Sequence, residues 1–300
     1  MNLVPVFGVG GLRIAQSTIN KQTSKYMNSM PTYYQFGLYF ESFAAIFSLI
    51  YFLIIRGGEY NVQTLIISII TGTCFFFELI TALKALQIAP LPLCTLCAFG
   101  GGIVIPAICG IFFFNEPLSL FQWGGAVLFF IAVYFLMFEK NQNTKVSISA
   151  ILVLAVNFLL NGALSLLSKY FAIFIENGSP ALYSCLSYIF ASILFVFAVI
   201  FSYKSVETKT KQKFINPFNT FEKPLYLYGV LLGAVCATIV FLNTFLSRTI
   251  PIIILNVIPT TISIVGSLFI GLWFFKEKIT YRKVIGIILS VISTLAIIML

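Results

Sequence analysis

Aspartate and histidine are both absent from this 300-residue sequence, and all nine acidic residues are glutamates. A Ser-His-Asp triad, a histidine metal site and an aspartyl dyad are therefore excluded. Charged residues are also scarce, at 9% of the chain, whereas soluble domains contain about 25%. We expect no enzymatic activity, no cofactor and no metal site.

The chain is instead rich in apolar residues, which make up 60% of it and give a mean hydropathy of +1.03. A water-soluble fold cannot bury that much apolar surface, so the composition predicts a membrane protein. Apolar runs of the roughly 20 residues that a spanning helix needs predict an all-α polytopic fold of about ten transmembrane helices. The beginning of the chain is interpreted as the first of these helices and not as a removable signal peptide. The expected helices cover 3–24, 33–55, 62–86, 89–113, 118–138, 147–171, 180–203, 224–247, 251–275 and 281–300, with the longest loop at 204–223.

An internal repeat divides the chain. Residues 72–131 align without a gap with residues 233–292. This predicts two five-helix units, residues 1–140 and 141–300. Because five is an odd number, the second unit enters the membrane in the opposite direction, and inverted repeats of this kind enclose a central site in many transporters. The aligned pairs include Gly72 with Gly233, Pro90 with Pro251, Gly110 with Gly271, Glu116 with Glu277 and Gly125 with Gly286.

Two sets of short motifs carry a family resemblance. The first set is Gly100, Gly101, Gly102, Pro106, Phe113, Phe114, Asn115, Glu116, Pro117, Leu118, Ser119, Gly124 and Gly125; the second is Pro251, Pro259, Phe275, Lys276, Glu277, Lys278, Ile279, Thr280 and Gly286. They resemble the two EamA-type repeats of the drug/metabolite transporter superfamily, over nearly the whole chain. The resemblance implies ten helices in two inverted halves that move a small organic solute across a membrane. It also implies that both termini are cytoplasmic, and it does not identify the solute. The chain is similar to small bacterial members of the family in being low in charge and rich in isoleucine, lysine, asparagine and phenylalanine, which implies the plasma membrane.

Glu78 lies deep within the expected helix 62–86, where an ionisable side chain is costly and commonly faces a transport pathway. A polar stripe on an apolar helix faces either water or another helix. Substrate contact or proton coupling through Glu78 is one interpretation, and a buried interhelical hydrogen bond or ion pair is the other. The polar residues that share its helix face are Thr64, Ser68, Thr71 and Thr81.

Glu41 is a second candidate for ion coupling. Its position nearer to a helix end also allows it to snorkel to the interface or to pair with Lys25. Two further sets of polar residues, the second of them a stripe on one helix face, are candidates for substrate contact or for polar links between helices. They are Gln16, Ser17, Thr18 and Asn20 in the first helix, and Asn157, Asn161, Ser165 and Ser168 in the sixth.

Helix-breaking residues occur at matching places in the two units. Gly100, Gly101 and Gly102 in the fourth helix and Pro259 in the ninth predict interrupted helices at a transport site, or else close helix packing. A single Cys94-x-x-Cys97 motif without a second pair favours packing over metal binding. We expect a structural role for the repeat signature Glu116, Glu277, Gly125 and Gly286, and for a capping box formed by Ser119 and Gln122.

The basic residues are distributed unevenly. Fourteen lysines and arginines lie in or beside the odd-numbered loops, and three (Arg56, Lys169 and Arg248) in the even-numbered ones. The positive-inside rule therefore places the odd-numbered loops in the cytoplasm and both termini outside. The resemblance implies the opposite orientation, and the sequence leaves this conflict open.

Together these features predict a secondary transporter of a small organic metabolite or drug, an exporter or exchanger, that works by alternating access. No nucleotide-binding motif is present, so ATP drive is not expected. The expected partners are the lipid bilayer, a small-molecule substrate and protons, without nucleic acid; a homodimer is left open. A channel or membrane scaffold without carrier activity is the alternative, whereas an intramembrane enzyme has no supporting constellation of residues.

Overall fold

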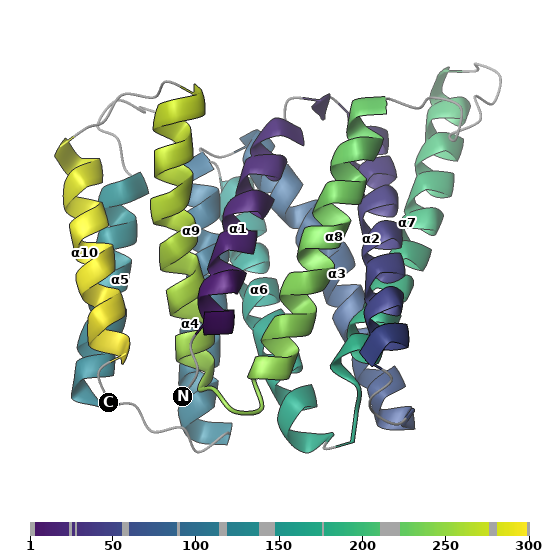
Figure 1. Cartoon of the computed structure of the whole chain (residues 1–300). Coiled ribbons are helices and arrows are strands. Elements are labelled where there is room, and N and C mark those ends of the chain that lie inside the picture. Colours follow the sequence, from purple (N-terminus) through teal and green to yellow (C-terminus); the bar gives the residue numbers. More distant parts are fainter. Residues whose placement is uncertain are drawn as a thin grey trace.

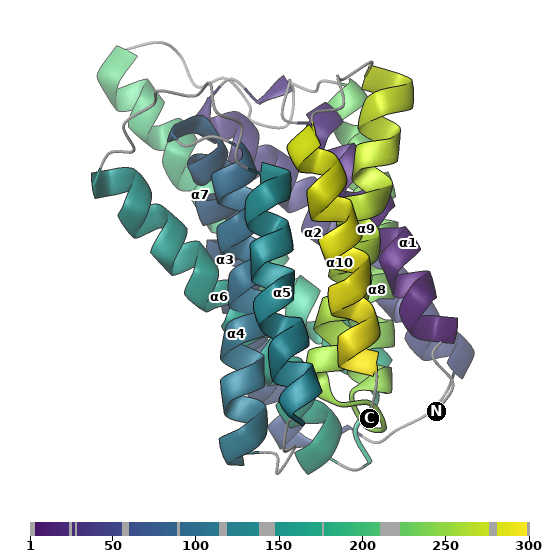
Figure 2. The same cartoon turned by 90° about the vertical axis from the view of Figure 1, so that its left-hand side faces the viewer.

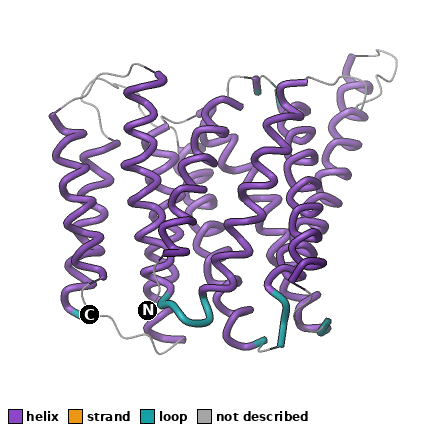
Figure 3. Tube along the Cα trace, viewed as in Figure 1, coloured by secondary structure: helices purple, strands orange, loops and turns teal. Residues whose placement is uncertain are grey.

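The computed structural model describes residues 4–23, 26–27, 29–55, 60–88, 91–113, 119–137, 148–175, 177–210, 223–275 and 281–298. These residues form ten α-helices and no β-strand (Figures 1 and 3). The helices are α1 Val4–Thr23, α2 Met30–Ile55, α3 Val62–Ile88, α4 Leu91–Phe113, α5 Leu120–Met137, α6 Ile148–Phe174, α7 Pro180–Thr210, α8 Lys223–Leu246, α9 Ile252–Phe275 and α10 Tyr281–Ile298.

The ends of these helices lie close to those expected from the apolar runs, with one larger difference at α7. This helix continues to Thr210, so the expectation of a loop beginning at residue 204 is wrong. Lysine and glutamate are good helix formers, and extending an existing helix costs much less than nucleating a new one. Residues 211–222 of the expected loop lie outside the described residues.

The outer surface of the bundle is apolar. Five helices are long and apolar enough to cross a membrane: α2, α6 and α8 over their full length, α3 from Val62 to Ala85, and α7 from Pro180 to Ser202. Large apolar side chains such as Phe112 and Leu120 are exposed, while many serine and threonine side chains are buried between helices. This reverses the usual distribution in a soluble protein and matches what lipid requires of a protein surface. These are the features of a helical, multi-pass membrane protein.

The helices pack in a broad bundle. On one side of it α2 packs against α7 and α8, and α3 packs against α7. On the opposite side α5 and α10 form a pair (Figures 1 and 2). Between these groups, α1 packs along α9 and α4 packs along α6. The first and last described residues lie at the same end of the bundle (Figure 1).

Glycines allow several of these helices to approach closely. A methyl group added at Gly233 of α8 would lie 2.8 Å from the backbone nitrogen of Ala44 in α2, and one added at Gly72 of α3 would collide with the carbonyl oxygen of Ser187 in α7. A side chain at Gly101 of α4 would collide with the backbone of Phe158 in α6. These contacts leave room for a hydrogen atom only.

The expected interruptions of α4 and α9 are not present. Both helices run without a break, although Pro106 lies inside α4 and Pro259 inside α9. Gly100 also packs against α6: a methyl group added there would lie 3.2 Å from a ring carbon of Phe158. The glycines of α4 therefore serve close packing, and the alternative of an unwound segment is wrong.

The contact between α5 and α10 involves part of the repeat signature. A methyl group at Gly125 would lie 2.7 Å from the side chain of Ile297, and the Ser293 hydroxyl donates to the Gly125 carbonyl at 2.8 Å. Gly286 of α10 is buried, whereas Glu116 and Glu277 lie outside the described residues. The capping box is confirmed: the Ser119 amide donates to Gln122 Oε1 at 3.0 Å, and the Gln122 amide donates to Ser119 Oγ at 3.3 Å.

Candidate functional site

The polar faces of α3 and α6 meet and form a cluster of Glu78, Thr81, Asn157 and Asn161, here called the α3–α6 polar cluster. Asn161 Nδ2 donates to Glu78 Oε1 at 3.3 Å and to the Asn157 carbonyl at 3.0 Å. Asn157 Nδ2 donates to Thr81 Oγ1 at 3.2 Å and to the Glu78 carbonyl at 3.4 Å. Two stripes that were separate candidates in the sequence thus form one hydrogen-bonded group. It holds a carboxyl group in place with side-chain amides.

Further along the same helices, Thr71 and Ser168 both meet Tyr183 of α7. Thr71 Oγ1 lies 2.9 Å from the Tyr183 hydroxyl, and the Ser168 side chain also hydrogen-bonds to Tyr183. Ser68 Oγ donates to the Tyr183 carbonyl at 3.2 Å, and Phe171 stacks on the Tyr183 ring at a centroid distance of 4.4 Å. Thr71 is fully buried in this contact. The arrangement has the form of a polar link between three helices.

Glu41 lies in the interior of α2 and is only 1% exposed, so the expectation that it snorkels to an interface is wrong. Its Oε2 atom is buried without a hydrogen-bond partner among the described residues. The carboxyl groups of Glu41 and Glu78 are close enough to interact electrostatically. Lys25, the expected ion-pair partner, lies outside the described residues. A buried carboxyl oxygen without a partner is costly, and this cost indicates a site that acquires a proton, water or a ligand.

Arg13 of α1 brings a positive charge to the same interior. Its Nη1 donates to Thr260 Oγ1 of α9 at 3.2 Å, while its Nε is buried without a partner in the described structure. Cys236 of α8 lies close enough to Arg13, Glu41 and Glu78 to interact electrostatically with all three, and its thiol is hydrogen-bonded to the side chain of Gln16. The predicted residue Gln16 thus lies at the same interior region.

The charged and polar groups of this interior come from both predicted units: α1, α2 and α3 from the first, and α6, α8 and α9 from the second. Pro259 is buried in α9 beside Thr260, which Arg13 contacts. The proline has no amide hydrogen and cannot bond to the carbonyl of Leu255 four residues earlier. Within the described residues, no group of three cysteines or glutamates is placed so that it could hold a metal ion, since the interaction of Cys236 with the two glutamates is electrostatic only.

Sequence reasoning missed Arg13, Cys236, Tyr183 and Thr260 as members of this interior. A signal existed for Arg13, because an arginine inside an apolar segment of spanning length is itself an intramembrane charge. The other three carry no such signal. Cysteine, tyrosine and threonine are common in apolar helices, and only the packing of α1 against α8 and α9 and of α3 against α7 brings these three into the interior.

Two basic residues counted as loop charges have structural roles at the end of the bundle that holds the termini. Lys169 is buried in α6, and its Nζ donates to the carbonyls of Ser247 at 2.8 Å and Ile250 at 3.1 Å. Arg248 Nη2 donates to the Gly178 carbonyl at 2.7 Å. These bonds hold the α8–α9 turn against α6 and the α6–α7 turn.

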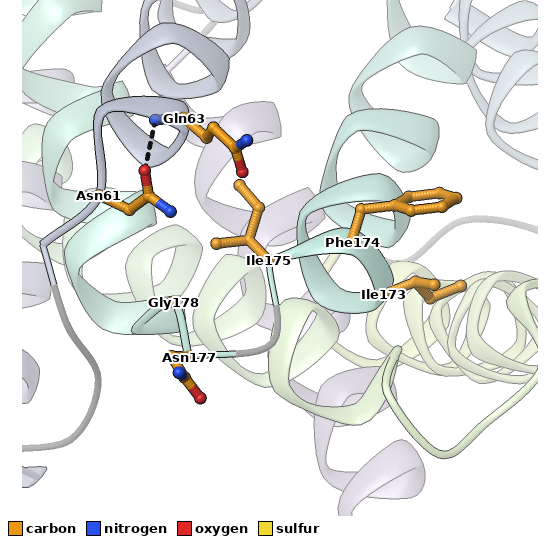
Figure 4. Close-up of a pocket in the computed structure, with 7 residues that line it drawn as sticks. All are labelled: Asn61, Gln63, Ile173, Phe174, Ile175, Asn177 and Gly178. Carbon is orange, nitrogen blue, oxygen red and sulfur yellow. Dashed lines mark hydrogen bonds between the residues drawn. The ribbon is translucent and has the colours of Figure 1, made fainter.

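A pocket of about 340 Å³ opens at the same end, beside the beginning of α3 and the α6–α7 turn (Figure 4). The Gln63 amide donates to Asn61 Oδ1 at 3.0 Å, so the Asn61 side chain caps the beginning of α3. None of the predicted site residues lines this pocket. Its lining residues are Asn61, Gln63, Ile173, Phe174, Ile175, Asn177 and Gly178.

Comparison with known proteins identifies the fold but not the activity. No family model and no curated protein matches the chain. The crystal structure of one other protein aligns with this chain at a TM-score of 0.72 and 14% sequence identity. The alignment covers 98% of this chain and 96% of the other. At this identity the likeness shows that the chain adopts a fold already seen in a crystal, and it shows nothing about the activity of the chain.

Proposed function

We propose that this protein is a secondary transporter of a small organic solute in the plasma membrane, of the EamA type within the drug/metabolite transporter superfamily. In this proposal all ten helices span the membrane, and the two five-helix units at 1–140 and 141–300 form an inverted repeat. The solute binds between the units and is released on either side by alternating access. Protons are the proposed coupling ion, and a homodimer remains compatible with the fold.

The helix packing supports the inverted repeat. If α1 to α5 are exchanged with α6 to α10, each major contact is converted into another major contact: α2 with α8 becomes α7 with α3, and α1 with α9 becomes α6 with α4. The matched glycines behave in the same way, since Gly72 packs α3 on α7 and Gly233 packs α8 on α2. A single unrepeated bundle would have no reason to show this exchange symmetry.

The observation that carries the proposal is the charged interior. Glu78 is held by Asn161, inside a bundle with an apolar surface. Among the residues that the structure describes, one buried oxygen of Glu41 and one buried nitrogen of Arg13 have no hydrogen-bond partner. Intramembrane charges are rare because they are expensive, and they usually mark ion or substrate pathways. Helices from both units contribute to this interior, as alternating access requires.

Counterflow in proteoliposomes tests the proposal. Purified protein is reconstituted with a high internal concentration of an unlabelled candidate solute, and a trace of the same labelled solute is added outside. A carrier accumulates the label transiently, because exchange is faster than net efflux. The solute panel is first reduced by thermal-shift screening of the purified protein against metabolite classes.

The alternative is a channel or a scaffold. A channel conducts much faster than a carrier and shows no counterflow, and a scaffold shows neither conduction nor counterflow. The hydrogen bonds from Asn157 and Asn161 to α3 would also suit a scaffold, since polar side chains commonly link membrane helices. Absence of counterflow for every stabilising solute, with or without ion conduction, would refute the carrier proposal.

A further inference from the structure

The guanidinium group of Arg13 has no carboxylate partner in the described structure, although two glutamates lie in the same interior. Its hydrogen bond goes to the neutral hydroxyl of Thr260 at 3.2 Å, and its Nε is buried without a partner. Arginine presents five donors in a rigid fork that suits a carboxylate. An unpaired charge of this kind is costly inside a membrane protein, so its place in the fold indicates that an anion completes it.

Thr260 offers a second donor at the same place. Its oxygen accepts a hydrogen bond from Arg13, and the hydroxyl donates to no group among the described residues, so its hydrogen can bond to a ligand. The next residue, Thr261, instead donates to the carbonyl of Val257 in its own helix at 2.9 Å. Thr260 is 1% exposed, whereas the Arg13 side chain retains partial exposure. The two side chains thus bring donors from α1 and α9 together, and part of the Arg13 side chain is exposed.

The crossing of α1 and α9 positions these donors firmly. A methyl group added at Gly10 of α1 would lie 2.7 Å from Ile262 of α9, and Gly266 of α9 is packed in turn against Ile14 of α1. Each helix places a glycine against a bulky residue of the other. Because this contact joins the two predicted units, an anion held there would touch both of them.

The charge of the surroundings restricts the kind of anion. Arg13 contributes a single positive charge beside the neutral hydroxyl of Thr260. A doubly charged group such as a phosphate monoester would keep one negative charge without a partner there, which is costly at low dielectric. A single carboxylate matches the one positive charge of Arg13.

From these observations we propose that Arg13 and Thr260 form the subsite that binds the carboxylate group of the transported solute. The site then selects monocarboxylates over phosphate esters and uncharged solutes. This inference deepens the proposed transport function and rests on it, but its test measures binding and does not require transport.

The test titrates the purified full-length protein with butyrate, with its uncharged amide butyramide and with inorganic phosphate, and follows thermal stability. Butyrate should stabilise the wild type saturably, and the other two should not. Arg13→Gln should weaken butyrate binding roughly 30-fold or more, as expected when one partner of a buried charged pair is removed. Thr260→Val should weaken it about fivefold, the cost of one hydrogen bond.

Matched controls separate binding from folding. Thr261→Val and Arg248→Gln should leave the affinity for butyrate unchanged, because Thr261 bonds to its own helix and Arg248 bonds to the Gly178 carbonyl. If Arg13→Gln does not fold, Arg13→Lys keeps the charge but loses the fork, and it should weaken butyrate binding while keeping discrimination against butyramide.

The inference is overturned if butyrate binds the wild type and Arg13→Gln equally, if phosphate binds and butyrate does not, or if no saturable binding occurs. Counterflow separates its failure from that of the proposed function. Counterflow of other solutes without butyrate binding through Arg13 removes the subsite and keeps the carrier. Butyrate binding through Arg13 without any counterflow removes the carrier and keeps the subsite.

Discussion

At the scale of single residues, this molecule is defined by how its few buried charges are partnered. Glu78 accepts a hydrogen bond from Asn161. Within the described part of the chain, Glu41 Oε2 accepts no hydrogen bond and Arg13 Nε donates none. Lys169, by contrast, donates to two carbonyls at a turn. The satisfied lysine is structural, and the incompletely satisfied groups are the ones from which we expect function.

Glu78→Gln tests the coupling role. Glutamine keeps the shape and still accepts the hydrogen bond from Asn161, so folding and expression should be unchanged, but the side chain can no longer release or take up a proton. We expect uptake driven by a pH gradient in proteoliposomes to fall to the level of empty liposomes. Lys84→Gln, at an exposed position on the same helix, serves as the control. Proton-driven uptake that persists in Glu78→Gln would remove Glu78 from the coupling role.

Asn161→Leu separates the functional interpretation of the α3–α6 polar cluster from a merely structural one. The substitution removes the donor to Glu78 and to the Asn157 carbonyl, which should lower the free energy of unfolding by about 0.6 to 2 kcal/mol. If the cluster positions Glu78 for coupling, proton-driven uptake should also decrease, measured at equal amounts of folded protein. Reduced thermal stability with unchanged transport would identify the cluster as polar linkage between helices.

At the scale of helices, close contact through glycine determines which elements can pair. The neighbouring residues Gly124 and Gly125 of α5 illustrate this difference. A methyl group at Gly125 would meet Ile297, Ser293 and Ala296 of α10, whereas one at Gly124 would meet nothing within 4 Å. One of two adjacent glycines therefore carries the α5–α10 contact.

This contrast gives a matched pair of variants. Gly125→Ala should destabilise the protein by about 1–3 kcal/mol, the usual cost of overpacking. Gly124→Ala should be neutral or slightly stabilising, because alanine has the higher helix propensity. Thermal unfolding of both variants in the same detergent measures the difference. Equal stability of the two would show that α5 and α10 do not pack as described.

At the scale of the whole molecule, the inverted repeat and the orientation are the main predictions. Ser29, before α2, and Asn177, before α7, occupy similar places in the two units, and both are exposed. In an inverted repeat they lie on opposite sides of the membrane. The excess of lysine and arginine in the odd-numbered loops predicts that Ser29 faces the cytoplasm, which places the termini outside.

Cysteine labelling checks both points. Ser29→Cys and Asn177→Cys are each introduced into a variant whose six native cysteines are replaced by alanine, and a membrane-impermeant maleimide is applied to intact cells. We expect Asn177→Cys to react from outside and Ser29→Cys to react only after permeabilisation. Reaction of Ser29→Cys alone from outside would keep the inversion but reverse the orientation. Reaction of both from the same side would refute the inverted repeat.

Much of the fold could be predicted because a helix that spans a bilayer must be apolar over about 20 residues, which leaves a pattern in the sequence. Helix α7 was the exception, since its last residues are polar helix formers beyond the apolar run. The stripe that contains Glu78 and the stripe that contains Asn161 were also visible, because helical spacing places such residues on one face. Their hydrogen bond to each other was not visible.

The amino-acid sequence by itself determined the class of protein, the positions of the helices and the residues that are too polar for lipid, because hydropathy and helical periodicity are local properties. Only the tertiary structure decided which of those polar residues meet. It joined Asn161 to Glu78, buried Glu41, linked Thr71 to Tyr183 and brought Arg13 to Thr260, 247 positions away in the chain. Such pairings depend on close contacts between distant helices, and local pattern carries no information about the distance between two segments once the chain has folded.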